Sequence, residues 1–311
     1  MIAATNASAT ERSCARAHAH RRRPLRAAGP RCGFVDSRAA ARDNPPVSRP
    51  AQTSFAARLR RMRSKRNEDW WSIVFGGPIA TVLTAAVADT PWVTPNRLTW
   101  LAFVTKLVAA ACIVLGAAGG PHHFMPHDVI AIVCMQANTV LDCMDGTLAR
   151  HRGMSSVYGA FLDKVTDALG MLAVMSAFGW RVLHDTGDAA AMVVCLAAVM
   201  LWTARIYAYW VVAFFERDRG VPNATARAET RADLGELSFR QRLAYYLRSS
   251  WRILAFSEAD AFFWLALALA TGWLRPVAYV YGIGLAAGSL WILFRRLVRA
   301  AQIDAWLRSK V

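Results

Sequence analysis

The 311-residue sequence has only six cysteines, and none of them forms a CxxC pair or the spacing of a zinc site. Acidic residues are scarce, with 21 Asp and Glu against 37 Lys and Arg. The N-terminal region also lacks the apolar core that a secretory signal peptide needs. These absences exclude a disulfide framework, a cysteine-based zinc site and a secretory signal peptide.

The excess of positive charge is concentrated in residues 1–69, which hold 16 Lys and Arg against 5 Asp and Glu. We expect this segment to be a disordered basic tail, because it has too few large aliphatic side chains to bury a core. Three interpretations stay open: an organelle transit peptide, a tail lying on anionic lipid, and an untranslated stretch with Met62 as the true start. The remaining charge is ordinary for a membrane protein, so we expect no nucleic-acid partner.

From Trp70 onward the chain consists mostly of apolar blocks separated by short polar joints. A helix needs about 20 apolar residues to cross a bilayer. The blocks therefore predict an all-α polytopic membrane bundle of six transmembrane helices preceded by an interfacial helix. The predicted spans are 98–118, 129–149, 157–180, 189–214, 260–274 and 277–294. The membrane domain would cover residues 70–300, with 301–311 as a cytoplasmic C-terminal tail.

The interfacial helix is expected over residues 70–88, because Trp70 and Trp71 follow a basic cluster. Gly76-Gly77-Pro78 should interrupt it. Basic side chains are enriched in the N-terminal segment, the 150–156 joint, the 216–258 loop and the C-terminus, and alternate joints are poor in them. The positive-inside rule then places both termini in the cytoplasm. The 216–258 loop is amphipathic around residues 239–254, which suits a helix lying on lipid.

Four aspartates lie near the predicted cytoplasmic ends of the second and third spans. Asp142 and Asp145 stand three residues apart with Gly146 beside them, and Asp163 and Asp167 stand four apart. These spacings put each pair on one face of a helix. The short joint makes the two helices antiparallel neighbours, so their acidic faces should meet at a similar depth.

Four carboxylates this close could not all stay ionised in a low-dielectric setting without compensation. Two divalent cations would balance them, and ligands that are all oxygen favour Mg²⁺ or Mn²⁺ over zinc. Such a pair of ions suits phosphoryl chemistry. The residues alone therefore predict a metal-dependent reaction on a phosphate ester at the membrane surface.

The same positions carry a complete motif: Asp142-x2-Asp145-Gly146-x2-Ala149-Arg150-x8-Gly159-x3-Asp163-x3-Asp167. This motif resembles the signature of the CDP-alcohol phosphotransferase family. The resemblance implies six spans, a homodimer, and transfer of a phosphatidyl or other phospho-alcohol group from a CDP-linked donor to an alcohol, with release of CMP. CDP-diacylglycerol is the expected donor, and a polar alcohol is the expected acceptor.

The resemblance also implies roles for the matched residues. Asp142 and Asp163 would bridge two metal ions, Asp145 would hold the first ion, and Asp167 would ligate the second and act as general base. The CDP moiety would contact Gly146, Arg150, Ser156 and Gly159, with Asn96 and Thr99 from an upstream element, Thr94-Pro95-Asn96-Arg97-Leu98-Thr99.

Two basic residues inside the predicted spans, Lys106 and Arg205, are candidates for contact with an anionic acceptor such as glycerol phosphate or inositol phosphate. The alternatives are pairing with an aspartate or reaching toward the interface. For the reaction, one alternative is the same chemistry with a soluble CDP-alcohol donor and a lipid acceptor. A second alternative is a cation transporter that uses intramembrane aspartates.

Overall fold

The computed structural model describes residues 54–62, 69–117, 123–221, 240, 253 and 256–310. Within these residues every regular element is helical, which confirms the all-α prediction. The elements are α1 (Phe55–Arg61), η1 (Ser72–Gly76), α2 (Gly77–Val87), α3 (Pro95–Leu115), α4 (Pro126–Arg152), α5 (Val157–Thr186), α6 (Ala189–Asp218), α8 (Glu258–Thr271) and α9 (Leu274–Arg308).

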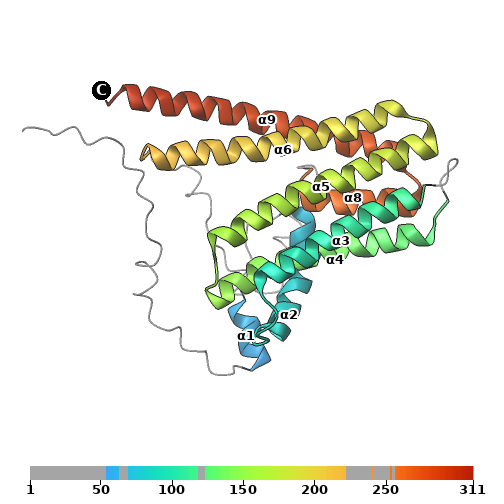
Figure 1. Ribbon diagram of the computed structural model, residues 1–311, viewed down its shortest axis with the longest axis horizontal. Coiled ribbons are helices and arrows are strands. Elements are labelled where there is room, and N and C mark those ends of the chain that lie inside the picture. Colours follow the sequence, from blue (N-terminus) through green and yellow to red (C-terminus); the bar gives the residue numbers. More distant parts are fainter. Residues whose placement is uncertain are drawn as a thin grey trace, which may run out of the picture. The chain divides into compact units, whose positions relative to one another are not determined.

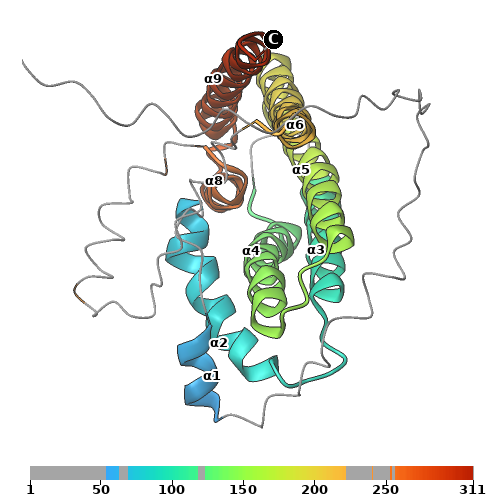
Figure 2. The same cartoon turned by 90° about the vertical axis from the view of Figure 1, so that its left-hand side faces the viewer.

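Six of these helices form a closed ring. Around it, α3 packs on α4, α4 on α8, α8 on α9, α9 on α6, α6 on α5, and α5 on α3. The view along the bundle in Figure 2 shows this order, with α2 outside the ring against α4. The centre of the ring is filled by apolar side chains from all six helices, including Phe178, Trp202, Phe262 and Tyr281.

The helices begin and end where the sequence supplies capping groups. Thr94 caps α3, and its side chain accepts a hydrogen bond from the Arg97 amide. Ser156 caps α5 in the same way through the Gly159 amide. Gly153 ends α4 with φ of 64°, a left-handed conformation that glycine adopts without strain. The joint between α4 and α5 is therefore short (Figure 1), but the prediction that the two helices are direct neighbours is wrong, because α3 packs against both and separates them.

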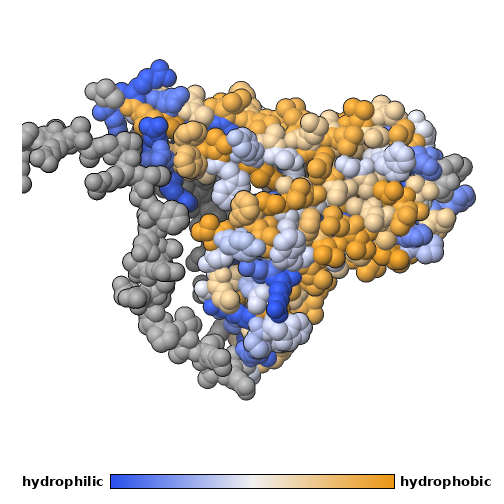
Figure 3. Space-filling model, in the orientation of Figure 1, coloured by the Kyte–Doolittle hydropathy of each residue, from blue (hydrophilic) through white to orange (hydrophobic). Residues whose placement is uncertain are grey.

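Four of the described helices are long and apolar enough to cross a membrane: α3, α4, α6 and α9. Large apolar side chains such as Met200, Tyr207 and Leu297 point outward from these helices. Figure 3 shows apolar residues over the middle of the bundle and hydrophilic residues toward its two ends. α5 has 30 residues but is not among these four helices, and α8 has only 14 residues.

Several predicted boundaries differ from the structure. The interfacial helix is present, but Gly76-Gly77-Pro78 does not break it: a π-helical turn, η1, leads into α2, and Pro78 occupies the first turn of α2, where its missing N–H costs nothing. The third predicted span ends at residue 180, whereas α5 continues to Thr186.

The two predicted tails also differ in part. Phe55–Arg61 form α1, and Leu59 packs on Met62, Ala85 and Ala88. Residues 301–308 continue α9 instead of leaving it, because Ile303 is buried against Val212 and Val221. Residues 1–53 lie outside the described residues, as does most of the predicted amphipathic segment 239–254.

Candidate active site

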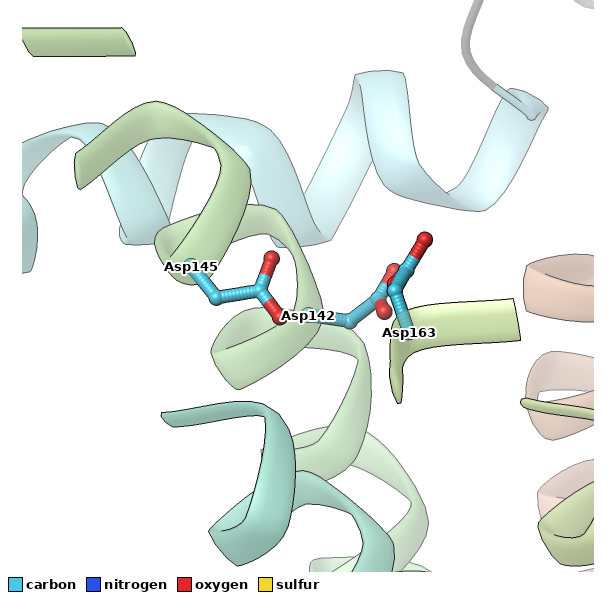
Figure 4. Close-up of side chains that lie close together, drawn as sticks. All are labelled: Asp142, Asp145 and Asp163. Carbon is cyan, nitrogen blue, oxygen red and sulfur yellow. The ribbon is translucent and has the colours of Figure 1, made fainter. Parts of the chain in front are cut away.

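The last three turns of α4 and the first three turns of α5 carry the four motif aspartates. Asp142, Asp145 and Asp163 each offer an oxygen within 4.8 Å of the others. Figure 4 shows the carboxylates of Asp142 and Asp145, from α4, converging on that of Asp163, from α5. The helical spacing thus brings these three together as predicted.

These three carboxylates fit a hard divalent cation. Their donor atoms are all oxygen, which suits Mg²⁺ or Mn²⁺. In the described part of the chain, no lysine or arginine forms an ion pair with Asp142 or Asp145. The hydroxyl of Thr99 donates to the Asp145 carboxylate and holds it from α3. Like charges this close need a cation between them.

Asp167 is not one of these three carboxylates. A lysine binds each of its two oxygens. Nζ of Lys106 lies 3.0 Å from Oδ1, and Nζ of Lys164 lies 3.0 Å from Oδ2. Lys164 also pairs with Asp163 at 2.8 Å. Lys106 therefore pairs with an aspartate, which was one of the two alternatives to acceptor contact.

The residues predicted to hold the nucleotide lie on the other side of the three carboxylates. A Cβ built on Gly159 would lie 3.1 Å from Oγ of Ser156 and 3.2 Å from Oδ1 of Asn96, so these three residues meet. A Cβ on Gly146 would lie 3.0 Å from Nη1 of Arg150. Glycine at both positions leaves room for polar side chains to lie close to the backbone.

Arg152 supports this region, a role that its place in the basic 150–156 joint does not predict. Its guanidinium, at the end of α4, donates to four backbone carbonyls, those of Val87, Ala88, Thr90 and Val93. These carbonyls end α2 and form the turn that leads to Thr94 and α3. Arg152 thereby fixes the segment that presents Asn96 and Thr99.

A cavity of about 330 Å³ opens beside Asp167, and none of the predicted nucleotide residues lines it. Arg205 of α6 lines it, and its contact with an acceptor stays a prediction. The other charged side chains in its wall are Asp69, Lys164, Glu258 and Arg296. The guanidinium of Arg296 also lies over the ring of Tyr209, 4.8 Å from its centroid.

Asp69 and Glu258 reach the cavity through a contact between two helix starts. The Ala259 amide at the start of α8 donates to Asp69 at 3.4 Å, and the Trp71 amide donates to Asp260 at 2.9 Å. Burial raises the pKa of the Asp69 carboxyl above its ordinary value. Sequence reasoning missed both carboxylates. The only available signal was the capping pattern Ser257-x2-Asp260 before an apolar run, which marks a helix start but no site.

Comparison with known proteins gives three findings. A family model described as CDP-alcohol phosphatidyltransferase matches residues 92–284. Archaetidylinositol phosphate synthase of Pyrococcus horikoshii is 29% identical over 83 residues, which are 27% of this chain; the match spans only 39% of that relative's length. The crystal structure of Mycobacterium tuberculosis phosphatidylinositol phosphate synthase (PgsA1) with CDP-DAG bound aligns with a TM-score of 0.43 at 18% identity, over 71% of this chain and 93% of that one.

Proposed function

The chain belongs to the CDP-alcohol phosphatidyltransferase family, whose model covers most of the helical ring, and we propose on this basis that it transfers a phosphatidyl group from CDP-diacylglycerol to a polar alcohol. The observation that carries the proposal is the group of three convergent carboxylates beside Asp167 and an adjoining cavity. The protein is a multi-pass integral membrane protein. A lipid donor keeps its acyl chains in the bilayer while its head group reaches the site from the side.

Asp142, Asp145, Asp163 and Asp167 would hold two Mg²⁺ or Mn²⁺ ions. When bound, such ions neutralise phosphate charge and stabilise the leaving group. Asn96, Thr99, Gly146, Arg150, Ser156 and Gly159, from α3, α4 and the start of α5, would bind and orient the CDP moiety.

The reaction then needs one proton acceptor. The carboxylate of Asp167 takes the proton from the acceptor hydroxyl, and the hydroxyl oxygen forms a bond to the β-phosphorus of the donor. The bond between that phosphorus and the bridging oxygen breaks, and CMP leaves with the electron pair. Asp167 suits this role because it lies between the other carboxylates and the cavity.

We propose that the acceptor carries a phosphate. Lys164, Arg205 and Arg296 supply positive charge in the cavity wall, and Asp69 and Glu258 could accept hydrogen bonds from hydroxyls. An alcohol with both kinds of group, such as inositol phosphate, matches this lining. The name of the Pyrococcus relative, a synthase of archaetidylinositol phosphate, agrees with this class. Lys106 stays a weaker candidate for acceptor contact, since its ammonium is already bound twice.

The membrane topology is part of the same proposal. α5 and α8 would complete six spans with α3, α4, α6 and α9, and both termini would face the cytoplasm. The ring order supports six spans, because α5 and α8 each lie between two of the four apolar helices. The active site would then lie near the cytoplasmic face, and the protein would act as a homodimer.

The decisive experiment uses purified full-length protein in nanodiscs with CDP-diacylglycerol and Mn²⁺ or Mg²⁺. Inositol phosphate, glycerol phosphate, inositol and serine are offered in parallel, with CMP release and the lipid product by mass spectrometry as readouts. We expect CMP only with a phosphorylated acceptor. No CMP from any pairing, including soluble CDP-alcohols with lipid acceptors, would refute the transferase proposal.

Arg205→Gln tests separately whether the cavity binds a phosphorylated acceptor. Losing a charged hydrogen bond costs about 1.5–3 kcal/mol, so KM for the phosphorylated acceptor should rise by about tenfold or more. KM for CDP-diacylglycerol should not change. Equal rates with inositol and inositol phosphate in the wild type would contradict a phosphate-reading cavity.

A further inference from the structure

Lys106 occupies an unusual place for a lysine. It lies about three turns into α3, and its side chain is only 3% exposed. Its ammonium is 3.0 Å from Oδ1 of Asp167 and 3.0 Å from Oε1 of Glu258. It therefore joins three helices, α3, α5 and α8, at the edge of the cavity. A buried charge is costly unless it is well paired, so this placement calls for an explanation.

The path of the Lys106 side chain crosses α5 at Gly170. A Cβ built on Gly170 would lie 2.2 Å from Cδ of Lys106 and 3.2 Å from its Cβ and Cγ. All three nearest atoms thus belong to this one lysine. Gly170 follows Asp167 by three residues, so both lie on the same face of α5. This face of α5 provides both the carboxylate and the space through which the lysine reaches it.

The two lysines that bind Asp167 differ in how firmly they are held. Lys164 comes from the same helix, its side chain is 44% exposed, and it also pairs with Asp163. Lys106 comes from a neighbouring helix and is enclosed. Oδ1 of Asp167 is thus fixed by an enclosed partner, whereas Oδ2 is bound by a solvent-accessible lysine that also pairs with Asp163.

We propose that Lys106 is the positioning residue for Asp167. It holds the carboxylate by Oδ1, and Oδ2 is left to take the proton of the acceptor hydroxyl. Glu258 anchors the ammonium from α8, so the same cavity wall that receives the acceptor also fixes the base. The inference rests on the proposed function, in which Asp167 is the general base.

Steady-state kinetics of Lys106→Met in nanodiscs test this role. The variant keeps the length of the side chain and removes its charge. We expect kcat for CMP release to fall by about 100-fold, the effect of a misplacement of about 1 Å, while KM for CDP-diacylglycerol stays within about twofold. The matched control is Arg181→Met, which removes another buried cation between two carboxylates, at the far end of α5. If Arg181→Met loses as much thermal stability as Lys106→Met, it should still keep the wild-type kcat.

A double-mutant cycle with Gly170 keeps the inference falsifiable if Lys106→Met is poorly folded. Gly170→Ala retains the lysine but displaces it, so kcat should fall by about tenfold in the wild type. In a Lys106→Ala background, where Cγ and Cδ are gone, the same change should cost less than about twofold. An equal cost in both backgrounds would assign Gly170 to helix packing alone and overturn the inference.

The outcomes separate this inference from the proposed function. An active wild type with unchanged kcat in Lys106→Met would overturn the positioning role and leave the proposed function standing. A loss of activity no greater than that of Arg181→Met at equal stability would do the same. A wild type that releases no CMP with any substrate pair would overturn both.

Discussion

Two buried clusters of charged side chains lie at opposite ends of α4 and α5, and they differ in how far their carboxylates outnumber their cations, by one at the far end and by three at the active site. At the far end, Arg181 binds Asp128 at 3.0 Å and also pairs with Asp185, and all three side chains are 0% exposed. Arg181 donates further to the carbonyl of Ile113. At the active-site end, two lysines face five carboxylates: Asp142, Asp145, Asp163, Asp167 and Glu258.

The difference shows how to tell a structural charge cluster from a functional one. Both contain ionised groups that are costly to bury. The far cluster is closed, and its cation is shared between its two carboxylates. The active-site cluster has an excess of negative charge and opens onto a cavity, which is the arrangement expected where cations and a charged substrate bind. Substitutions at the two ends should therefore affect different quantities.

Asp167→Asn should produce the largest effect. The amide keeps the shape of the side chain but cannot take the acceptor proton, so kcat for CMP release should fall by about 1,000-fold. The protein should remain folded and should still bind Mn²⁺ through the three convergent carboxylates, as measured by electron paramagnetic resonance. The control is Asp185→Asn, the same change at the far end, with kcat retained. Near-wild-type turnover in Asp167→Asn would remove Asp167 from its role as base.

Arg181→Met should have the opposite effect: it should lower the stability of the protein and leave kcat unchanged. Removing the shared cation leaves Asp128 and Asp185 buried without compensation, so the free energy of unfolding should fall by about 3–5 kcal/mol. Chemical denaturation of the purified protein measures this loss. CMP release per folded molecule should be unchanged below the melting temperature. A fall in kcat without a loss of stability would mean that the far cluster acts on the reaction, and the contrast between the two ends would be wrong.

The sequence predicted the group of aspartates better than the cavity beside it, for a physical reason. The family assignment is confirmed, and Asp142, Asp145 and Asp163 meet because helical periodicity places side chains three and four residues apart on one face. These are local relations along two consecutive helices that a short joint connects, although α3 packs between them. Six spans remain a prediction, since four helices in the described residues are long and apolar enough.

The cavity could not be predicted in the same way. Asp69, Glu258 and Arg296 come from segments far apart in the sequence, and no periodic pattern of charged residues relates them. Their meeting depends on how the ring of six helices closes, which tertiary packing decides. Gly170 is a similar case: nothing local distinguishes it from a packing glycine until the Lys106 side chain is seen to cross it.

Arg152→Lys tests the proposed nucleotide-binding half of the site. Of the predicted changes, it should have the smallest effect. A lysine keeps the charge but cannot reach four carbonyls at once, because its ammonium has no planar fork of donors. The turn before Thr94 should loosen, and KM for CDP-diacylglycerol should rise about threefold, which is on the order of 0.6 kcal/mol. Values of kcat and of KM for the acceptor should stay the same. Arg299→Lys, which alters a pair with Glu216 between α6 and α9, is the matched control. If Arg152→Lys instead raised KM for the acceptor, the turn would serve the cavity, and the division of the site into a nucleotide half and an acceptor half would have to be redrawn.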